Sequence, residues 1–156
     1  MTVQVEVVTH ISAPPQVVFD LELDVDVHTA SLVASGETAR TSTGARTLGL
    51  GDQVTFTARH LGRTRQMTAV ITEYERPARF VDEQVRGPFH RMRHEHLFAP
   101  DGAGGTRMVD RMSVQVPGGP LGAVGAAVVL RPYLRRLLVM RAKHIKESAE
   151  AEGPPT

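Results

Sequence analysis

The chain has 156 residues, 41% of them hydrophobic and 22% charged, with no cysteine and a formal net charge of +1. This balance excludes a strongly basic surface for nucleic acid or anionic membrane, and the lack of cysteine excludes disulfides, thiolate nucleophiles and cysteine-ligated metals. The simplest organisation for this length is one domain over residues 1–151 with a flexible tail at 152–156.

Apolar and polar residues alternate along much of the chain, which is the period of a strand with one face toward a core. Glycine and proline interrupt the alternation, as at Leu61-Gly62 and in the loop Pro100–Gly105, and mark turns between neighbouring strands. The pattern predicts strands at 3–11, 37–42, 53–59, 65–75, 80–85, within 87–98, and 106–116.

Three helices are expected. Proline is tolerated in a first helical turn, so the prolines at 14 and 15 are compatible with a short helix that extends to residue 21. A second short helix begins at residue 24 and ends between 32 and 35. From 121 to 151 the apolar period becomes helical, with a kink or restart at Pro132 because proline has no amide donor.

This order of elements predicts an α+β fold. Neighbouring strands joined by short turns should pair antiparallel, giving a curved sheet of about seven strands. The long C-terminal helix is the only element large enough to cover the concave face of that sheet, which would wrap on it. The two short helices after the first strand would hold one end open, so that a cavity persists between sheet and helix.

The stretch Gly87–Phe98 carries most of the distinctive chemistry. One side of the extended chain has an aromatic, a thioether and imidazoles, namely His90, Met92, His94, His96 and Phe98. The other side has mainly ions suited to water, namely Arg91, Arg93, Glu95 and Leu97. We expect the histidine side to face a ligand cavity, and the arginine side to face solvent together with Arg107 and Arg111 of the next strand.

Asp110 should lie opposite His96 in the hairpin around the 101–105 loop. His94, His96 and Asp110 are therefore expected to form a cluster with three possible roles. It can be a polar network that fixes the register of the sheet, a group that orients a ligand or transfers protons, or a His-His-carboxylate metal site. The network is the simplest interpretation, and we predict no metal and no cofactor.

The predicted cavity wall combines bulky apolar side chains with the polar cluster, and the bulky phenylalanines and methionines are equally compatible with positions in a packed core. Its residues are Phe56, Phe80, Asp82, Met92, His94, His96, Phe98, Met108, Asp110, Met112, Leu130, Leu134 and Leu138. His28, Arg131 and Tyr133 could reach the cavity, but solvent exposure is the simpler expectation for each of them.

The chain resembles the SRPBCC superfamily, also called START or Bet v 1-like, and within it the bacterial polyketide cyclase/dehydrase-like ligand-binding branch. The resemblance covers residues 3–147 and implies a helix-grip fold. Its motifs are Ile11–Pro15, Val17–Asp20, Leu48–Asp52, Pro77–Asp82, Gly87–Phe89, His94–Phe98, and Gly105-Thr106 with Met108 and Asp110.

We predict that the cavity binds a small hydrophobic ligand that is lipid-, aromatic- or polyketide-like, with one polar group oriented by His94, His96 and Asp110. One alternative is an aromatase/cyclase-type enzyme that uses the same cavity for aldol closure and dehydration. A second alternative is a protein-interaction or assembly module, which an apolar outer sheet face would favour.

The remaining expectations concern partners and location. No long apolar segment suggests membrane insertion, no signal peptide is recognised, and interleaved exposed aromatics for nucleic acid are lacking. We therefore expect a cytoplasmic monomer or homodimer that does not bind nucleic acid.

Overall fold

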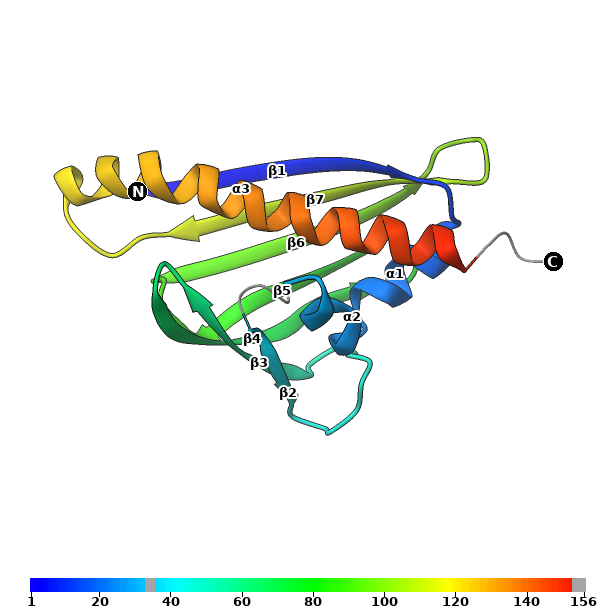
Figure 1. Cartoon of the computed structure of the whole chain (residues 1–156), viewed down its shortest axis with the longest axis horizontal. Coiled ribbons are helices and arrows are strands. Elements are labelled where there is room, and N and C mark those ends of the chain that lie inside the picture. Colours follow the sequence, from blue (N-terminus) through cyan, green and yellow to red (C-terminus); the bar gives the residue numbers. More distant parts are fainter. Residues whose placement is uncertain (33–35, 153–156) are drawn as a thin grey trace.

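The computed structural model describes residues 1–32 and 36–152. These residues form seven strands and three helices (Figure 1). In chain order the elements are β1 (Thr2–Ile11), α1 (Pro15–Glu22), α2 (Val25–Ala30), β2 (Thr38–Thr41), β3 (Gln53–His60), β4 (Arg63–Glu75), β5 (Arg79–Arg86), β6 (Arg91–Pro100), β7 (Thr106–Gln115) and α3 (Pro120–Ala151).

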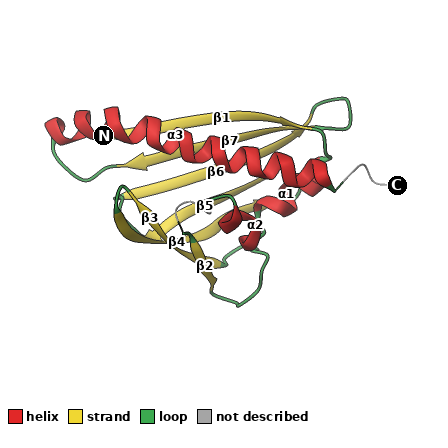
Figure 2. Cartoon of the chain, viewed as in Figure 1, coloured by secondary structure: helices red, strands yellow, loops and turns green. Residues whose placement is uncertain are grey.

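The strands form one antiparallel sheet in the order β1-β7-β6-β5-β4-β3-β2. From β2 to β7 each strand pairs with the next along the chain, and β1 pairs with β7 at the edge. Figure 2 shows α3 lying across one face of this sheet, with α1 and α2 at one end. The predicted α+β class and helix-grip arrangement are confirmed.

The tight turn expected at Leu61-Gly62 is present between β3 and β4. Both residues have positive φ, 51° at Leu61 and 76° at Gly62. Two successive residues in the left-handed region match the twist of a two-residue hairpin, and glycine at the second position takes that conformation without a steric cost. The hairpin fixes β3 against β4 in register from Gln53↔Val70 to His60↔Arg63.

The two short helices begin where the sequence predicts. Pro14 is extended, with φ −67° and ψ 152°, and α1 follows it directly. Asp24 caps α2 because its Oδ1 accepts hydrogen bonds from the backbone amides of Asp26 and Val27, at 3.0 and 3.2 Å. The helix ends at Ala30, earlier than expected, and the segment 33–35, where a later end was predicted, lies outside the described residues.

The long helix does not restart at Pro132, so of the two predicted outcomes, a kink or a restart, the restart is excluded. It runs as one element from Pro120 to Ala151, with Pro132 on an exposed position. Proline removes one backbone donor, and the turns that follow are held because Leu134 and Leu138 are buried in the core. The C-terminal tail from residue 153 lies outside the described residues.

From Arg135 onward, α3 is tied to the edge strand β1 and to Ser12 in the connection between β1 and α1. Arg135 Nη1 donates to the Glu6 carbonyl at 2.9 Å, and Lys146 Nζ donates to the His10 carbonyl at 2.7 Å. The Ser12 amide donates to Glu150 at 3.0 Å. These bonds hold the helix along β1, at one edge of the sheet. The helix alone therefore does not fill the space over β3 to β6.

The outer face of the sheet carries the arginines, as predicted. Arg79 contacts Glu73 and Glu95, and Arg111 reaches Glu6 at 2.9 Å and Glu95 at 2.8 Å. Such exposed pairs contribute little individually. Their presence means that this face is covered by charge, which is not the apolar surface that a protein-interaction module would need.

Phe19 of α1 lies at the centre of a cluster of aromatic rings in the core. It is completely buried, and three aromatic rings meet it edge-on with centroids 5.4 Å away, those of Tyr74, Phe80 and Phe98. The edge-to-face geometry adds to the burial of apolar area.

We expect Phe19→Ala to lower the free energy of unfolding by about 3–5 kcal/mol, because it removes a ring from a site that cannot collapse. Urea denaturation followed by circular dichroism measures this change. Val85→Ala at an exposed position is the control and should change stability little. If Phe19→Ala lowered the free energy of unfolding no more than Val85→Ala does, this account of the core would be contradicted.

Candidate functional site

A cavity of about 570 Å³ lies between the sheet and the helices. Ten of the thirteen residues predicted for its wall line it: Phe56, Phe80, Asp82, Met92, His94, His96, Met112, Leu130, Leu134 and Leu138. Most of the lining is apolar, which is typical of small-molecule sites.

Three predicted wall residues do not line the cavity. Phe98 is buried against Phe19 and Phe80, and Met108 is fully buried in the core. Asp110 is 2% exposed and lies behind the two histidines. Strand alternation gave the correct face for all three, but it does not distinguish a core position from a cavity position on the same face.

The exposure of the lining residues distinguishes the mouth of the cavity from its base. Exposed lining residues, among them Leu61, Gln66, Pro117 and Val129, belong to the β3–β4 turn, the first part of β4, the β7–α3 connection and the first half of α3. Buried lining residues, among them Glu22, Phe80, His94 and His96, belong to α1, β5 and β6. The mouth therefore lies at the first group and the base at the second.

Strand register brings the polar base together. His96 pairs with Asp110 across β6 and β7, as the sequence predicts, and His94 pairs with Asp82 across β5 and β6. His90, which the alternation assigned to the same face, precedes β6 and is exposed. That expectation was wrong because the chain bends at residues 87–90, so the strand period begins only at Arg91.

Asp110 contacts both histidines from the inner side. Its Oδ1 lies 3.1 Å from His94 Nε2 in a hydrogen bond, and also 3.1 Å from His96 Nδ1. The second contact is close enough for an ion pair, but its angles do not satisfy those of a hydrogen bond, so His96 Nδ1 has no hydrogen-bond partner.

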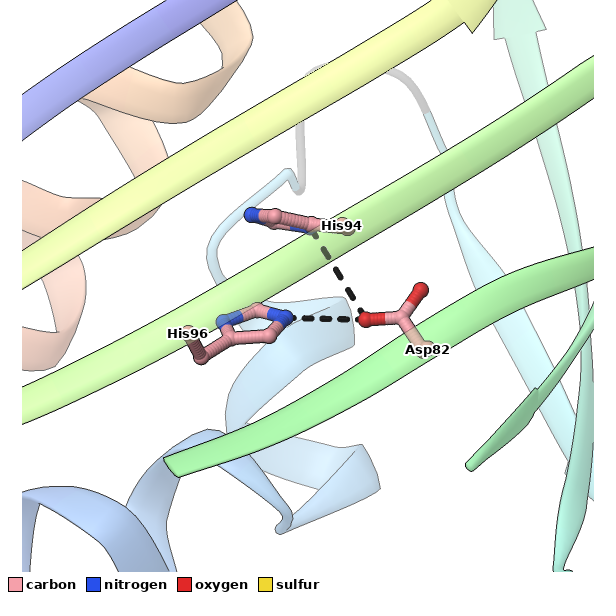
Figure 3. A group of neighbouring side chains, drawn as sticks. All are labelled: Asp82, His94 and His96. Atoms are coloured by element: carbon pink, nitrogen blue, oxygen red, sulfur yellow. Dashed lines mark hydrogen bonds and ion pairs between the residues drawn. The ribbon is translucent and has the colours of Figure 1, made fainter. Parts of the chain in front are cut away.

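Asp82 contacts the same two rings from the cavity side (Figure 3). Its Oδ2 lies 2.8 Å from His96 Nε2 and 3.9 Å from His94 Nδ1. The Asp82 side chain is 18% exposed, compared with 2% for His94, 5% for His96 and 3% for Asp110. Each ring therefore stands between one carboxylate at the cavity and one that is sealed in the sheet.

The two histidines are driven to opposite protonation states. Burial opposes a charge on His96, but Asp110, Asp82 and Glu22 outweigh it and raise the pKa of His96 to about 10. Burial, reinforced by the charge of His96, lowers the pKa of His94 despite its contact with Asp110. Against the effect of burial, the histidines lower the pKa of Asp110 and of Asp82, so both carboxylates are ionised at neutral pH.

Glu22 is a member of the base that the sequence did not predict. It ends α1, and its Oε2 lies 3.9 Å from His96 Nδ1, whereas its Oε1 is buried without a hydrogen-bond partner. Burial and the charge of Asp110 raise the pKa of Glu22 to about 7. The only signal in the sequence is a carboxylate at the end of an apolar helix, and that pattern is normally solvent-exposed.

A second polar pair, His28 and Glu37, also lines the cavity. His28 stacks on Phe56 with ring centroids 4.2 Å apart, and its Nε2 lies 3.4 Å from Glu37 Oε1. Burial, with the charge of Arg141, lowers the pKa of His28 well below its ordinary value, and burial raises the pKa of Glu37. The expectation that His28 is exposed was wrong, because α2 turns it inward against β3.

Two further residues of α3 reach the cavity. Tyr133, expected at the surface, lines it and forms a hydrogen bond with His60 Nδ1. Arg141 also lines it, and its buried Nε has no hydrogen-bond partner. Arg131 is exposed, as predicted. The wall therefore offers polar atoms at several separate points along an otherwise apolar surface.

Two groups of side chains among the described residues bring potential metal ligands within 4.8 Å of one another. They are Asp82 with His94 and His96, and Glu22 with His96 and Asp110. The first group faces the cavity, and the second is buried. No helix among residues 1–32 and 36–152 has the length and hydropathy needed to cross a bilayer.

Comparison with known proteins supports the resemblance seen in the sequence. Residues 2–150 match the family model described as polyketide cyclase / dehydrase and lipid transport. No curated protein matches the chain.

Solved structures share the fold at low sequence identity. The aromatase/cyclase ZhuI from Streptomyces sp. R1128 is 17% identical with a TM-score of 0.79, over 99% of this chain and 100% of that one. The protein TTHA0849 from Thermus thermophilus is 21% identical with a TM-score of 0.78, over 98% and 99%. A norcoclaurine synthase from Thalictrum flavum is 10% identical with a TM-score of 0.77, over 97% and 96%.

The raised pKa of His96 makes stability depend on pH. The folded protein keeps the His96 proton up to about pH 10, whereas an unperturbed histidine releases it near 6.5. This stabilisation is fully present below pH 6.5 and is lost as the pH rises through 10. We expect the free energy of unfolding to fall by a few kcal/mol between about pH 7 and 10, measured by urea denaturation.

His96→Gln should remove most of this slope and lower stability at neutral pH, because it leaves two buried carboxylates without their cation. His90→Gln, at an exposed position, should keep the slope of the unsubstituted protein. An equal slope in the His96 variant would show that other groups cause the pH dependence.

Proposed function

The chain belongs to the polyketide cyclase/dehydrase and lipid transport family, and we propose that it binds a small hydrophobic molecule of lipid, aromatic or polyketide type in the cavity. The observation that carries this proposal is the cavity itself, about 570 Å³ of space with a largely apolar wall. This volume lies in the range of small-molecule sites, and apolar burial would supply most of the affinity.

The polar atoms of the wall support a ligand with several oxygen-bearing groups. At the base, Asp82 and the two histidines can orient one polar group of the ligand. In the same cavity wall, Arg141 Nε is a buried donor without a hydrogen-bond partner. A buried donor that stays unpaired is costly, so it favours a ligand with a carbonyl, phenol or carboxylate oxygen at that point. A purely aliphatic molecule would leave these groups unpaired.

Filling the cavity from α3 tests this proposal. Ala126 lines the cavity, so Ala126→Phe places a ring in the space that the ligand needs. We expect the affinity for a fluorescent apolar probe such as ANS to fall roughly tenfold or more, because crowding an occupied apolar site costs about 1–3 kcal/mol. Fluorescence titration of the purified variant measures the change.

Val128→Phe is the matched control, since Val128 is 70% exposed on the same helix and does not line the cavity. It should bind the probe as the unsubstituted protein does. Equal affinity in both variants would place the probe outside the cavity. Native mass spectrometry of protein purified from its own host then identifies the molecule that it carries, and a consistently empty protein would contradict the carrier function.

A second candidate is an enzyme that transfers protons within the same cavity, as in aldol closure and dehydration. The opposite pKa shifts of His94 and His96 favour it, because such a pair supplies a neutral base beside a protonated acid. Both rings line the cavity. In this mechanism His94 would accept a proton from the carbon next to a ligand carbonyl, and His96 would donate one to the oxygen.

Exchange of the α-protons of a simple ketone such as cyclohexanone in D2O, followed by NMR, tests this candidate. An enzyme should accelerate the exchange roughly 100-fold or more over buffer, and His94→Gln should abolish the acceleration. His90→Gln should leave it unchanged. Exchange at the buffer rate in the unsubstituted protein would favour binding without turnover.

A further inference from the structure

We propose that His94 Nδ1, His96 Nε2 and Asp82 Oδ2 form a binding site for one divalent transition-metal ion at the base of the cavity. The site does not depend on the organic ligand proposed above. It rests on the positions of three donor atoms, on the second carboxylate behind them, and on the face that they present to the cavity.

The donor atoms have the spacing that a shared ion requires. Ligands bound at about 2.0–2.2 Å to a four-coordinate ion lie roughly 3.3 Å from one another. Asp82 Oδ2 is 2.8 Å from His96 Nε2 and 3.9 Å from His94 Nδ1, so the two distances fall on either side of this value. All three donors lie within 4.8 Å of one another. Figure 3 shows both rings directed at the same Asp82 oxygen.

The nitrogens that face away from this point are held by Asp110. Its Oδ1 lies 3.1 Å from His94 Nε2 and 3.1 Å from His96 Nδ1. Metal-binding histidines almost always direct their second ring nitrogen at a carboxylate or carbonyl, which fixes the ring and raises its basicity. Here one buried carboxylate lies against both rings, in a hydrogen bond with His94 and at ion-pair distance from His96.

The charge of the surroundings favours a cation. Glu22 lies beside Asp110 and the rings, and its buried Oε1 has no hydrogen-bond partner. Three carboxylates, those of Glu22, Asp82 and Asp110, therefore surround two imidazoles within a buried cluster. A divalent ion on the Asp82 side takes the place of the proton that His96 carries, which is released on binding, and balances the ionised Asp82 and Asp110.

The site has an open side. His94, His96 and Asp82 all line the cavity, and the Asp82 side chain is 18% exposed. Two imidazoles and one carboxylate, with no thiolate, suit Zn²⁺, Fe²⁺, Co²⁺ or Mn²⁺ better than Ca²⁺ or Mg²⁺. The open position can take water or an oxygen atom of a bound molecule.

Cobalt(II) is a suitable probe, because its visible absorption reports coordination number. Protein treated with a chelator and exchanged into metal-free buffer is titrated with Co²⁺, by absorption and by calorimetry. We expect one equivalent to bind with the spectrum of a four- or five-coordinate ion, and one equivalent of Zn²⁺ to displace it. Asp82→Asn and His94→Ala should abolish this binding, and Asp110→Asn should weaken it about 10- to 100-fold.

The control is His90→Ala, whose exposed imidazole lies outside the cluster, and it should bind Co²⁺ unchanged. NMR of the unsubstituted protein keeps the test valid if a variant fails to fold. Added Co²⁺ should shift or broaden the ring signals of His94 and His96 before those of His90. Signals that change first at His90, or no bound equivalent at all, would overturn the proposal and leave the cluster as a metal-free polar network.

Discussion

A single carboxylate oxygen, Asp110 Oδ1, contacts two imidazole rings at 3.1 Å and organises the base of the cavity. The contact depends on the register of three neighbouring strands, which pairs His96 with Asp110 and His94 with Asp82. Because side chains alternate, a slip of one residue in β6 would turn both histidines to the outer face and leave Asp110 buried alone. A lone buried carboxylate is costly, so the cluster and the register stabilise each other.

The cavity persists because α3 is held unevenly. Five of its six buried residues lie from residue 134 onward, namely Leu134, Leu138, Ala142, Ile145 and Ala149, and only Ala123 lies before it. The tethers to β1 and to Ser12 lie in the same stretch from residue 134 onward. The first half carries exposed apolar residues, among them Leu121, Val124 and Val128. The mouth thus lies beside the less anchored end of the helix, and the polar base beside the better anchored end.

Much of this arrangement could be predicted from the sequence. Strand alternation and a short loop suffice to place His96 opposite Asp110, since both are local properties of the chain. Glu22, His28 and Arg141 could not be placed in this way. Each belongs to a helix, and the direction that a helical side chain takes depends on how the helix docks, which local pattern does not specify. For the same reason the alternation could not separate Asp110 and Met108, behind the wall, from Met92 and Met112, which line it.

The inner side and the cavity side of the cluster differ in exposure, and this difference shows from which side an ion or ligand can reach it. Apolar residues of similar volume would often stabilise a sheet as well as buried ionised groups do, so stability alone does not explain the cluster. On the inner side Asp110 is buried, and its Oδ1 contacts both rings at 3.1 Å. On the cavity side the Asp82 side chain remains 18% exposed, and it faces the same rings. Any ion, proton or ligand oxygen that the cluster handles therefore has to approach between Asp82 and the histidines, with Asp110 holding the rings in place from behind.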